Sequence, residues 1–229
     1  MRTTKFLPYV PYAIAAVLNL AAGLVHADDL AKYAQWALMP LLAVAVLATL
    51  RPLRAPVAAW LLAAIAFSWG GDVLLGISFV LGLGSFLLAH VCFILAFTRR
   101  AIRGGNPAWR PGRLVVYVAL FLVLLGFLIG HVGAMLPAVV VYGLALCSMA
   151  AVAGRTSQVL EVAGLVFVLS DGLLALQLFR HDLAFPLSGF WVMLTYIAAE
   201  AGIAIGVTLA VKRSHSDAPI LLADAATSS

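Results

Sequence analysis

Long apolar segments recur along almost the whole chain, and this feature most constrains how it can fold. The segment FVLGLGSFLLAHVCFILAF at 79–97, for example, contains no Asp, Glu, Lys or Arg. A transmembrane helix needs about 20 predominantly apolar residues to cross the hydrocarbon core of a bilayer. Hydrophobic residues make up 65% of the 229 residues and charged residues 10%, against about half and about a quarter in soluble domains. The chain is therefore predicted to be an integral membrane protein.

The spacing of the apolar segments predicts an all-α, polytopic transmembrane bundle of about eight helices. Breaks rich in Pro, Gly and Arg, such as RPLRAP at 51–56 and RHDLAFP at 180–186, separate the segments. The expected spans are Pro8–His26, Tyr33–Leu50, Pro56–Gly76, Phe79–Phe97, Leu114–Gly130, Ala134–Ala153, Val159–Phe179 and Leu187–Val211. Because the turns after the third and fifth spans are short, seven helices are the alternative count. Residues 1–213 form one transmembrane domain in this interpretation, and 214–229 a disordered cytoplasmic tail.

The cations are unevenly shared between the two ends of these helices. With the N-terminus inside, twelve of the 14 Lys and Arg residues fall on the inner side, and only Lys32 and Arg180 fall outside. Cytoplasmic loops of membrane proteins carry such an excess of Lys and Arg. We therefore expect both termini to be cytoplasmic, in a bacterial inner membrane. The net charge of +5 is then a topology signal and not a sign of nucleic-acid binding.

Few polar side chains lie within the expected spans, and a carboxylate at mid-bilayer costs about 2.5 to 3.5 kcal/mol on insertion scales. Polar groups kept at this cost usually face the bundle interior and often have a function. The candidates are Asn19, Asp72, His90, Asp171 and Glu200, with Ser68, Ser170, Tyr142, Gln177 and Tyr196 as lesser ones. Glu161 lies near the cytoplasmic end of its span, and we expect it to be solvated there.

The acidic positions also suggest a weak internal repeat. Asp72 lies in the third span and Asp171 in the seventh, and both spans run from inside to outside. The spans that follow carry His90 and Glu200 near their middles. This pattern suggests two parallel four-helix halves, as repeats do in many transporters.

Several common reaction chemistries lack their sequence signatures. No G-x-S-x-G, Ser/Lys, HExxH or phosphate-binding glycine motif is present, and the His residues on the outer side have no metal-ligand spacing. Cys92 and Cys147 lie singly in apolar segments and form no CxxC pair. What remains is chemistry carried by carboxyl groups.

Several of these motifs are similar to those of one membrane-protein family. The segments FSWGGDVLLG (67–76), FVLGLGSFLLAHVCFILAF (79–97) and GLVFVLSDGLLAL (164–176), and more weakly LMPLLA (38–43) and YIAAE (196–200), carry the similarity. On these residues the chain resembles the YhhN, or lysoplasmalogenase-like, family. The resemblance implies cleavage of the vinyl ether bond of lysoplasmalogens, lysophospholipids that yield a fatty aldehyde and glycerophosphocholine or glycerophosphoethanolamine.

The resemblance implies roles for Asp72 and Asp171 first, and then for His90. The chain departs from the family pattern at two positions. Gln35 stands where the family often has a lysine, and Glu200 where it often has a glutamine. Both changes alter the charge of the expected pocket. If the lysine of the family contacts the phosphate, its absence at position 35 would change the preferred lipid or lower the activity.

Hydrolysis of a vinyl ether fits two buried acids. The rate-limiting step transfers a proton to carbon and makes an oxocarbenium ion, which water then captures. The enzyme needs a protonated acid, a nearby anion and a water molecule, as glycosidases do with paired carboxyl groups. We expect Asp72 and Asp171 to form this acid/base pair. We expect His90 and Glu200 to orient them or the water, and Tyr196 or Asn19 to bind the glycerol. No metal or organic cofactor is required.

Other readings of the same acids remain. A proton-coupled transporter or a lipid-binding carrier would use them as proton relays. An intramembrane aspartyl protease is disfavoured because Trp69 breaks its GxGD pattern. A structural or regulatory membrane protein is the fourth reading. The sequence sets neither the oligomeric state nor the adjacency of the helices.

Overall fold

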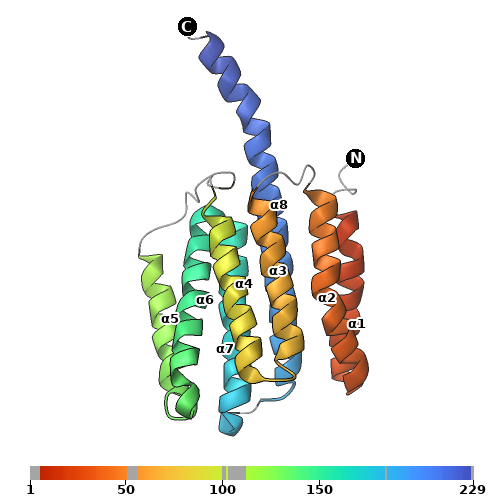
Figure 1. Cartoon of the computed structure of the whole chain (residues 1–229), viewed down its shortest axis with the longest axis vertical. Coiled ribbons are helices and arrows are strands. Elements are labelled where there is room, and N and C mark those ends of the chain that lie inside the picture. The colour runs from red at the N-terminus through yellow and green to blue at the C-terminus, as the bar shows by residue number, and fades with distance from the viewer. Residues whose placement is uncertain (1–5, 51–55, 100–101, 103–111, 184, 228–229) are drawn as a thin grey trace.

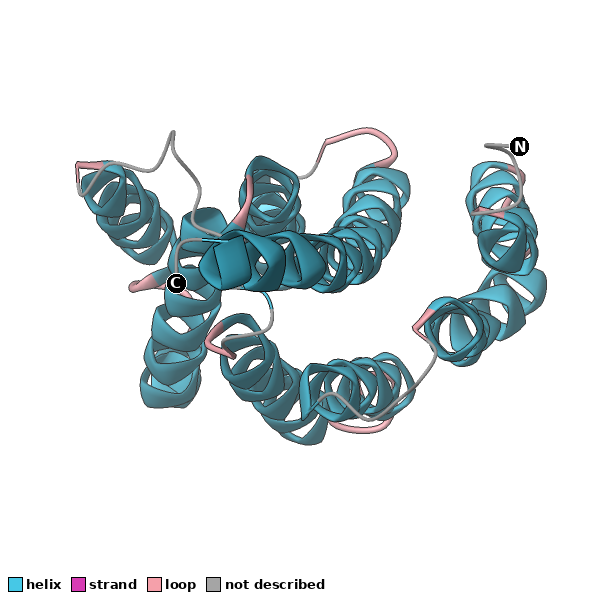
Figure 2. Ribbon diagram, turned by 90° about the horizontal axis from the view of Figure 1, so that it is seen from above, coloured by secondary structure: helices cyan, strands magenta, loops and turns pink. Residues whose placement is uncertain are grey.

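The computed structural model describes residues 6–50, 56–99, 102, 112–183 and 185–227, with side chains through Arg213. Within these residues the regular structure is all helical, as predicted (Figure 2). The eight α-helices are α1 (Val10–Leu24), α2 (Asp28–Thr49), α3 (Pro56–Leu74), α4 (Phe79–Phe97), α5 (Arg113–Leu128), α6 (Leu136–Thr156), α7 (Gln158–Phe179) and α8 (Ser188–Thr227). Short 3₁₀ turns cover Leu7–Tyr9, Gly133–Met135 and His181–Leu183.

The helices lie side by side in one bundle (Figure 1). In that view α5 stands at one edge and α1 at the opposite edge, with α3, α4, α7 and α8 between them. Consecutive helices pack as antiparallel pairs, including α3 with α4, α6 with α7, and α7 with α8. The start of α1 and the far end of α8 lie at the same end of the bundle, whereas the cytoplasmic assignment of that end stays a prediction.

In the part of the chain that the structure describes, seven helices are long and apolar enough to cross a membrane. The eighth, α5, has 16 residues, or about 24 Å at 1.5 Å per residue, against about 30 Å for the hydrocarbon core. Large apolar side chains are exposed around the bundle, among them Val115, Val118 and Leu122 on α5. Such a surface is unfavourable in water and favourable in lipid, so the fold is that of a multi-pass membrane protein.

The predicted helix boundaries agree with the structure to within three residues, except at the start of α2, which lies five residues before the expected Tyr33, and at the end of α8. Proline begins α3 at Pro56 and lies in the first turn of α6, where its missing N–H costs nothing. The Ser157 side chain accepts a hydrogen bond from the Leu160 N–H and starts α7. The last helix continues through Thr227, beyond the expected span end at Val211. The predicted disorder of 214–229 and the two four-helix halves stay predictions.

Small residues let α3 and α4 approach closely. A Cβ atom on Gly71 would lie 2.5 Å from the ring of Phe86, and one on Gly82 would lie 2.7 Å from the Leu75 backbone. Small residues drive helix association in membranes because they allow such contact between backbones. The tight α3–α4 hairpin places Phe86 directly beside the helix turn that carries Asp72.

One expectation about a membrane-embedded acid is wrong. Glu161 was expected to be solvated, but it is buried and pairs with Arg113 at the start of α5. The pair joins α5 to α7, and the charge of Arg113 compensates that of the buried carboxyl.

Candidate active site

Asp171 on α7 belongs to a hydrogen-bonded group with residues of α4 and α6. The Tyr142 hydroxyl donates to Oδ2 of Asp171, and His90 Nε2 lies 3.1 Å from the same hydroxyl and 3.6 Å from Oδ2. Because the single proton of Tyr142 goes to Asp171, the hydroxyl must accept from His90, so Nε2 carries a proton. The order of donation is therefore from His90 to Tyr142 to Asp171.

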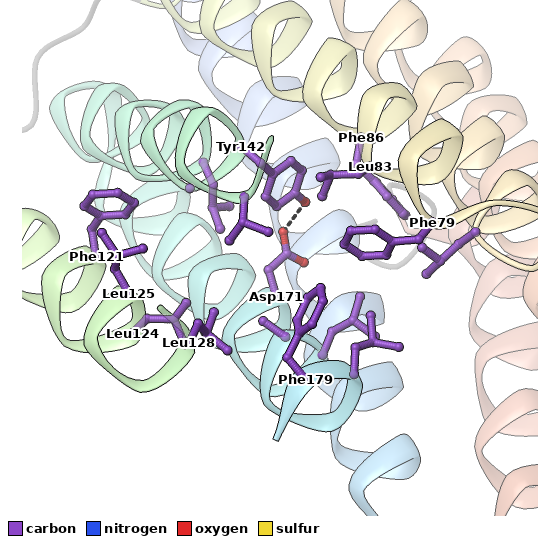
Figure 3. A pocket seen from close by; sticks show the side chains of 17 residues that line it. Phe79, Leu83, Phe86, Phe121, Leu124, Leu125, Leu128, Tyr142, Asp171 and Phe179 are labelled. Atoms are coloured by element: carbon purple, nitrogen blue, oxygen red, sulfur yellow. Dashed lines mark hydrogen bonds between the residues drawn. The ribbon is translucent and has the colours of Figure 1, made fainter. Parts of the chain in front are cut away.

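Asp171 and Tyr142 also form the polar part of an otherwise apolar pocket (Figure 3). Leu, Phe, Val, Ala and Gly side chains of α4, α5, α6 and α7, with Leu75 after α3, form the rest of the wall. The space between these side chains measures roughly 680 Å³ when the open space at its mouth is included. Among the described residues, no hydrogen bond is made to Oδ1 of Asp171. This oxygen is therefore available to a bound molecule.

Asp72 on α3 has different surroundings. Its Oδ1 accepts a hydrogen bond of 3.1 Å from Gln35 Nε2 on α2, and its Oδ2 accepts one of 2.9 Å from the Tyr196 hydroxyl on α8. Both oxygens thus have donors from other helices. Asp72 is not among the residues that line the pocket beside Asp171.

Glu200 and Ser68 complete this second group. The Ser68 hydroxyl donates to Oε1 of Glu200 at 2.7 Å, while Oε2 of the fully buried Glu200 has no hydrogen-bond partner. Ser68 lies one turn before Asp72, and Tyr196 lies one turn before Glu200. Two side-chain hydrogen bonds, one turn apart, therefore connect the antiparallel helices α3 and α8.

A layer of aromatic rings stands between the two groups. The ring of Phe86 contacts that of Tyr196 with a centroid distance of 6.0 Å and also lines the pocket. Phe167 contacts both Tyr196 and His90 edge to face. The structure thus brings the predicted residues into two adjacent clusters and not into one shared cavity, and no hydrogen bond between described residues joins Asp72 to Asp171.

Two other candidate residues make local helix–helix contacts. Asn19 donates to the backbone oxygen of Ala31, from α1 to α2, and Ser170 donates to the backbone oxygen of Val192, from α7 to α8. Neither lines the pocket beside Asp171. The expected contact of Asn19 with glycerol therefore has no support from its position.

Sequence reasoning gave too little weight to two residues. Tyr142 was only a lesser candidate, yet it donates to Asp171. Gln35 was noted only as a departure from the family pattern, yet it donates to Asp72. A signal for Tyr142 existed: it lies one to two turns from the N-terminal end of α6, and Asp171 about two turns from the C-terminal end of α7. Consecutive antiparallel helices bring such positions to a similar depth.

Comparisons with known proteins give the family. The profile of the YhhN family matches residues 30–207. Two relatives, from Mycobacterium bovis and Mycobacterium tuberculosis, are named lysoplasmalogenase, and each is 36% identical over 163 residues. The match covers 64% of this chain, which spans 59% of the length of either relative. No solved structure matches the chain. With a profile match over most of its length, the chain belongs to the YhhN family.

Proposed function

We propose that this protein is a membrane-embedded hydrolase that cleaves the vinyl ether bond of lysoplasmalogens. The products are a fatty aldehyde and glycerophosphocholine or glycerophosphoethanolamine. The observation that carries the proposal is the Asp171 carboxyl, which stands with Tyr142 in the wall of a pocket that is otherwise apolar. The names of the two mycobacterial relatives agree with this substrate class.

The pocket suits a lipid with one hydrocarbon chain. Its apolar wall lies between helices that themselves expose apolar side chains to the surrounding lipid. A lysolipid can enter from a bilayer leaflet with its chain against this wall and its polar end toward the outer ends of α5 and α7. The vinyl ether then lies where chain and head group join, at the depth of Asp171.

Asp171 is the proposed general acid. Its Oδ1 donates a proton to the vinyl carbon that does not bear oxygen, and the C–O carbon becomes an oxocarbenium ion. The carboxylate left behind stabilises this cation across a short distance in a medium of low dielectric. Water then adds to the cation and returns a proton to the carboxylate. The resulting hemiacetal breaks its C–O bond to give the aldehyde and the free glycerol hydroxyl.

His90 and Tyr142 are the proposed positioning residues of this acid. The hydrogen bonds from His90 to Tyr142 and from Tyr142 to Asp171 fix the orientation of the Asp171 carboxyl. Because the Tyr142 hydroxyl binds Oδ2, Oδ1 stays free for a molecule in the pocket. His90 is fully buried and in contact with the rings of Tyr142 and Phe167. A side chain so held keeps the acid within hydrogen-bond reach of the reacting carbon, which contributes strongly to rate.

Asp72 is the proposed second acid. It lies on the other side of the aromatic layer and acts on the substrate without contact. Its two donors keep the carboxyl fixed, and a fixed negative charge stabilises a cation that develops in the neighbouring pocket. The proposed catalytic pair is thus kept, but with Asp171 in contact with substrate and Asp72 acting at a distance.

The test is release of aldehyde by the purified protein. We expect wild-type protein in lipid nanodiscs to cleave 1-alkenyl lysophosphocholine and to leave the 1-acyl ester intact. Asp171→Asn should abolish cleavage, while Asp29→Asn, a change of an exposed acid at the start of α2, should not. Aldehyde release by Asp171→Asn at the wild-type rate would contradict the mechanism. If the wild-type protein released no aldehyde, the proposed function itself would be contradicted.

A proton-coupled carrier is the alternative, and one observation favours it. Glu200 is fully buried with one carboxyl oxygen unpartnered, as expected for a group that takes up and releases protons within the membrane. Proton-linked lysolipid movement in liposomes, without aldehyde release, would support the carrier over the hydrolase.

A further inference from the structure

Arg180, directly after α7, is held in place at the outer ends of α5 and α7. Its Nε and Nη2 donate to the two carboxylate oxygens of Asp182 at 2.8 and 2.7 Å, and its Nη1 donates to the backbone oxygen of Phe127 at 2.9 Å. The guanidinium also lies 6.0 Å from the centroid of the Phe127 ring. An arginine side chain is flexible unless it is held, and here three hydrogen bonds hold it.

The fixed guanidinium lies at the outer edge of the pocket beside Asp171. Phe179 and Leu128 both line that pocket, and each is the chain neighbour of a residue in the Arg180–Phe127 hydrogen bond. The bond therefore crosses from α7 to α5 at the outer boundary of the pocket. The sequence predicts Arg180 to be one of only two cations on this side of the membrane, and the other, Lys32, is on α2.

Arg180 has N–H donors that are not engaged in the hydrogen bonds described above. A guanidinium carries five N–H groups in a planar fork, and three of them are engaged. One N–H on Nη1 and one on Nη2 remain without a partner among the described residues. The side chain is 15% exposed, so these groups can be reached from outside. A guanidinium N–H group donates a strong, charge-assisted hydrogen bond to a phosphate oxygen.

Arg180 lies farther along the chain than Asp171, toward the end of α7 where we place the polar end of the lipid. Arg180 follows Asp171 by nine residues, which is about 13.5 Å of backbone rise along a helix. A molecule with its ether at Asp171 and its head group toward this end of α7 would bring its phosphate toward Arg180.

We propose that Arg180 binds the phosphate diester of the lysophospholipid and sets the depth at which its ether bond lies. Asp182 and the Phe127 carbonyl are positioning groups that keep the guanidinium at the mouth of the pocket. The identity of the bound lipid rests on the proposed function, whereas the anion site rests on the geometry alone. It also gives the protein a phosphate contact that does not involve position 35.

The test compares lipids with and without phosphate. The probes are 1-alkyl lysophosphocholine, which carries the saturated ether and cannot be cleaved by this chemistry, and the matching 1-alkylglycerol, which lacks the phosphate. Binding of both to protein in nanodiscs is measured for wild type, Arg180→Gln, Arg180→Lys and Lys32→Gln. The last variant removes the other predicted outer cation and serves as the matched control.

We expect Arg180→Gln to weaken binding of the phosphate lipid about tenfold and to leave binding of the alkylglycerol unchanged. Arg180→Lys should recover part of the loss, because it keeps the charge without the fork, and Lys32→Gln should match wild type. The ratio of the two affinities within one variant corrects for any loss of folded protein. An unchanged ratio in Arg180→Gln, or an equal change in Lys32→Gln, would overturn the proposal.

Catalysis distinguishes this proposal from the proposed function. If wild type cleaves 1-alkenyl lysophosphocholine, Arg180→Gln should raise KM about tenfold with little change in kcat, whereas a fall in kcat alone would count against a binding role. If wild type releases no aldehyde, the proposed function fails. The binding ratio then still decides whether Arg180 is an anion site.

Discussion

Asp72 and Asp171 occupy similar settings in the sequence but different ones in the fold. Both lie in the C-terminal half of a largely apolar helix. Asp72 accepts hydrogen bonds at both oxygens and is not among the residues that line the pocket, whereas Asp171 accepts from Tyr142 at one oxygen and does line it. A buried acid whose oxygens are both engaged is suited to hold a charge, and one with a free oxygen at a pocket is suited to exchange a proton. The comparison teaches that burial alone does not identify the acid that reacts.

The largest expected effect separates the two aspartates directly. Asp171→Asn removes the proton donor, and losing a positioned general acid typically costs 10²–10⁴-fold in rate, so we expect a fall of about that size in kcat for lysoplasmalogen cleavage. The amide still fills the same space and can accept from Tyr142, so the protein should remain folded in a thermal unfolding assay. A wild-type kcat in this variant would remove the distinction between the two acids.

Asp72→Asn should act mainly on the fold and less on the rate. An amide oxygen can accept from only one of Gln35 and Tyr196 in the present geometry, so one buried donor loses its partner at a cost of about 1–3 kcal/mol. We expect a lower unfolding temperature and a fall in kcat of about tenfold from the lost field. If Asp72→Asn were fully stable yet lost activity as completely as Asp171→Asn, Asp72 would be the reacting acid.

Removing the hydroxyl group of each of the two tyrosines should have smaller effects on kcat, and the two effects can be compared directly. Tyr142→Phe removes the donor to Asp171 and breaks the path from His90, and Tyr196→Phe removes one donor to Asp72. We expect Tyr142→Phe to lower kcat about tenfold and Tyr196→Phe to change it by less than threefold, while both lose about 1 kcal/mol of stability. Equal kinetic effects in the two variants would argue against separate roles for the clusters.

The smallest effect concerns an acid outside the membrane. The N–H groups of Arg180 donate to Asp182 and lower the pKa of its carboxyl from 3.8 to about 2. A lowered pKa contributes stability that is present above pH 3.8 and is lost as the pH falls through about 2. Thermal unfolding of wild type and Asp182→Asn should therefore differ by the same small amount at pH 7 and pH 5. A difference that changes between those two values would show that another group titrates there.

The eight helices could be predicted because each apolar run is bounded by a polar or proline break. Pro56 and the Ser157 cap mark helix starts that the sequence places within two residues. The pairing of Asp72 with Gln35 and Tyr196 could not be predicted, since it joins α3 to α2 and α8. Helices in lipid are alike in hydrophobicity, and small residues and side-chain shapes decide which of them touch. The pairing of Tyr142 with Asp171, on consecutive helices, was within reach of the sequence.

The family relationship and the geometry bear on different parts of the proposal. The profile match over residues 30–207 includes both aspartates and His90, so it does not choose between them. The choice of Asp171 as the acid comes from its free oxygen, its pocket and its ordered donors. The proposed anion site at Arg180 extends the same argument to the outer end of α7.

Photo-crosslinking with a lysolipid that carries a diazirine beside its ether bond tests the central claim most directly. The claim predicts adducts on the residues that line the pocket, above all on peptides of α6 and α7 that contain Tyr142 and Asp171, and competition by unlabelled lysoplasmalogen. Adducts confined to peptides of α2, α3 and α8 around Gln35, Asp72 and Tyr196 would contradict it, because the substrate would then lie on the other side of the aromatic layer.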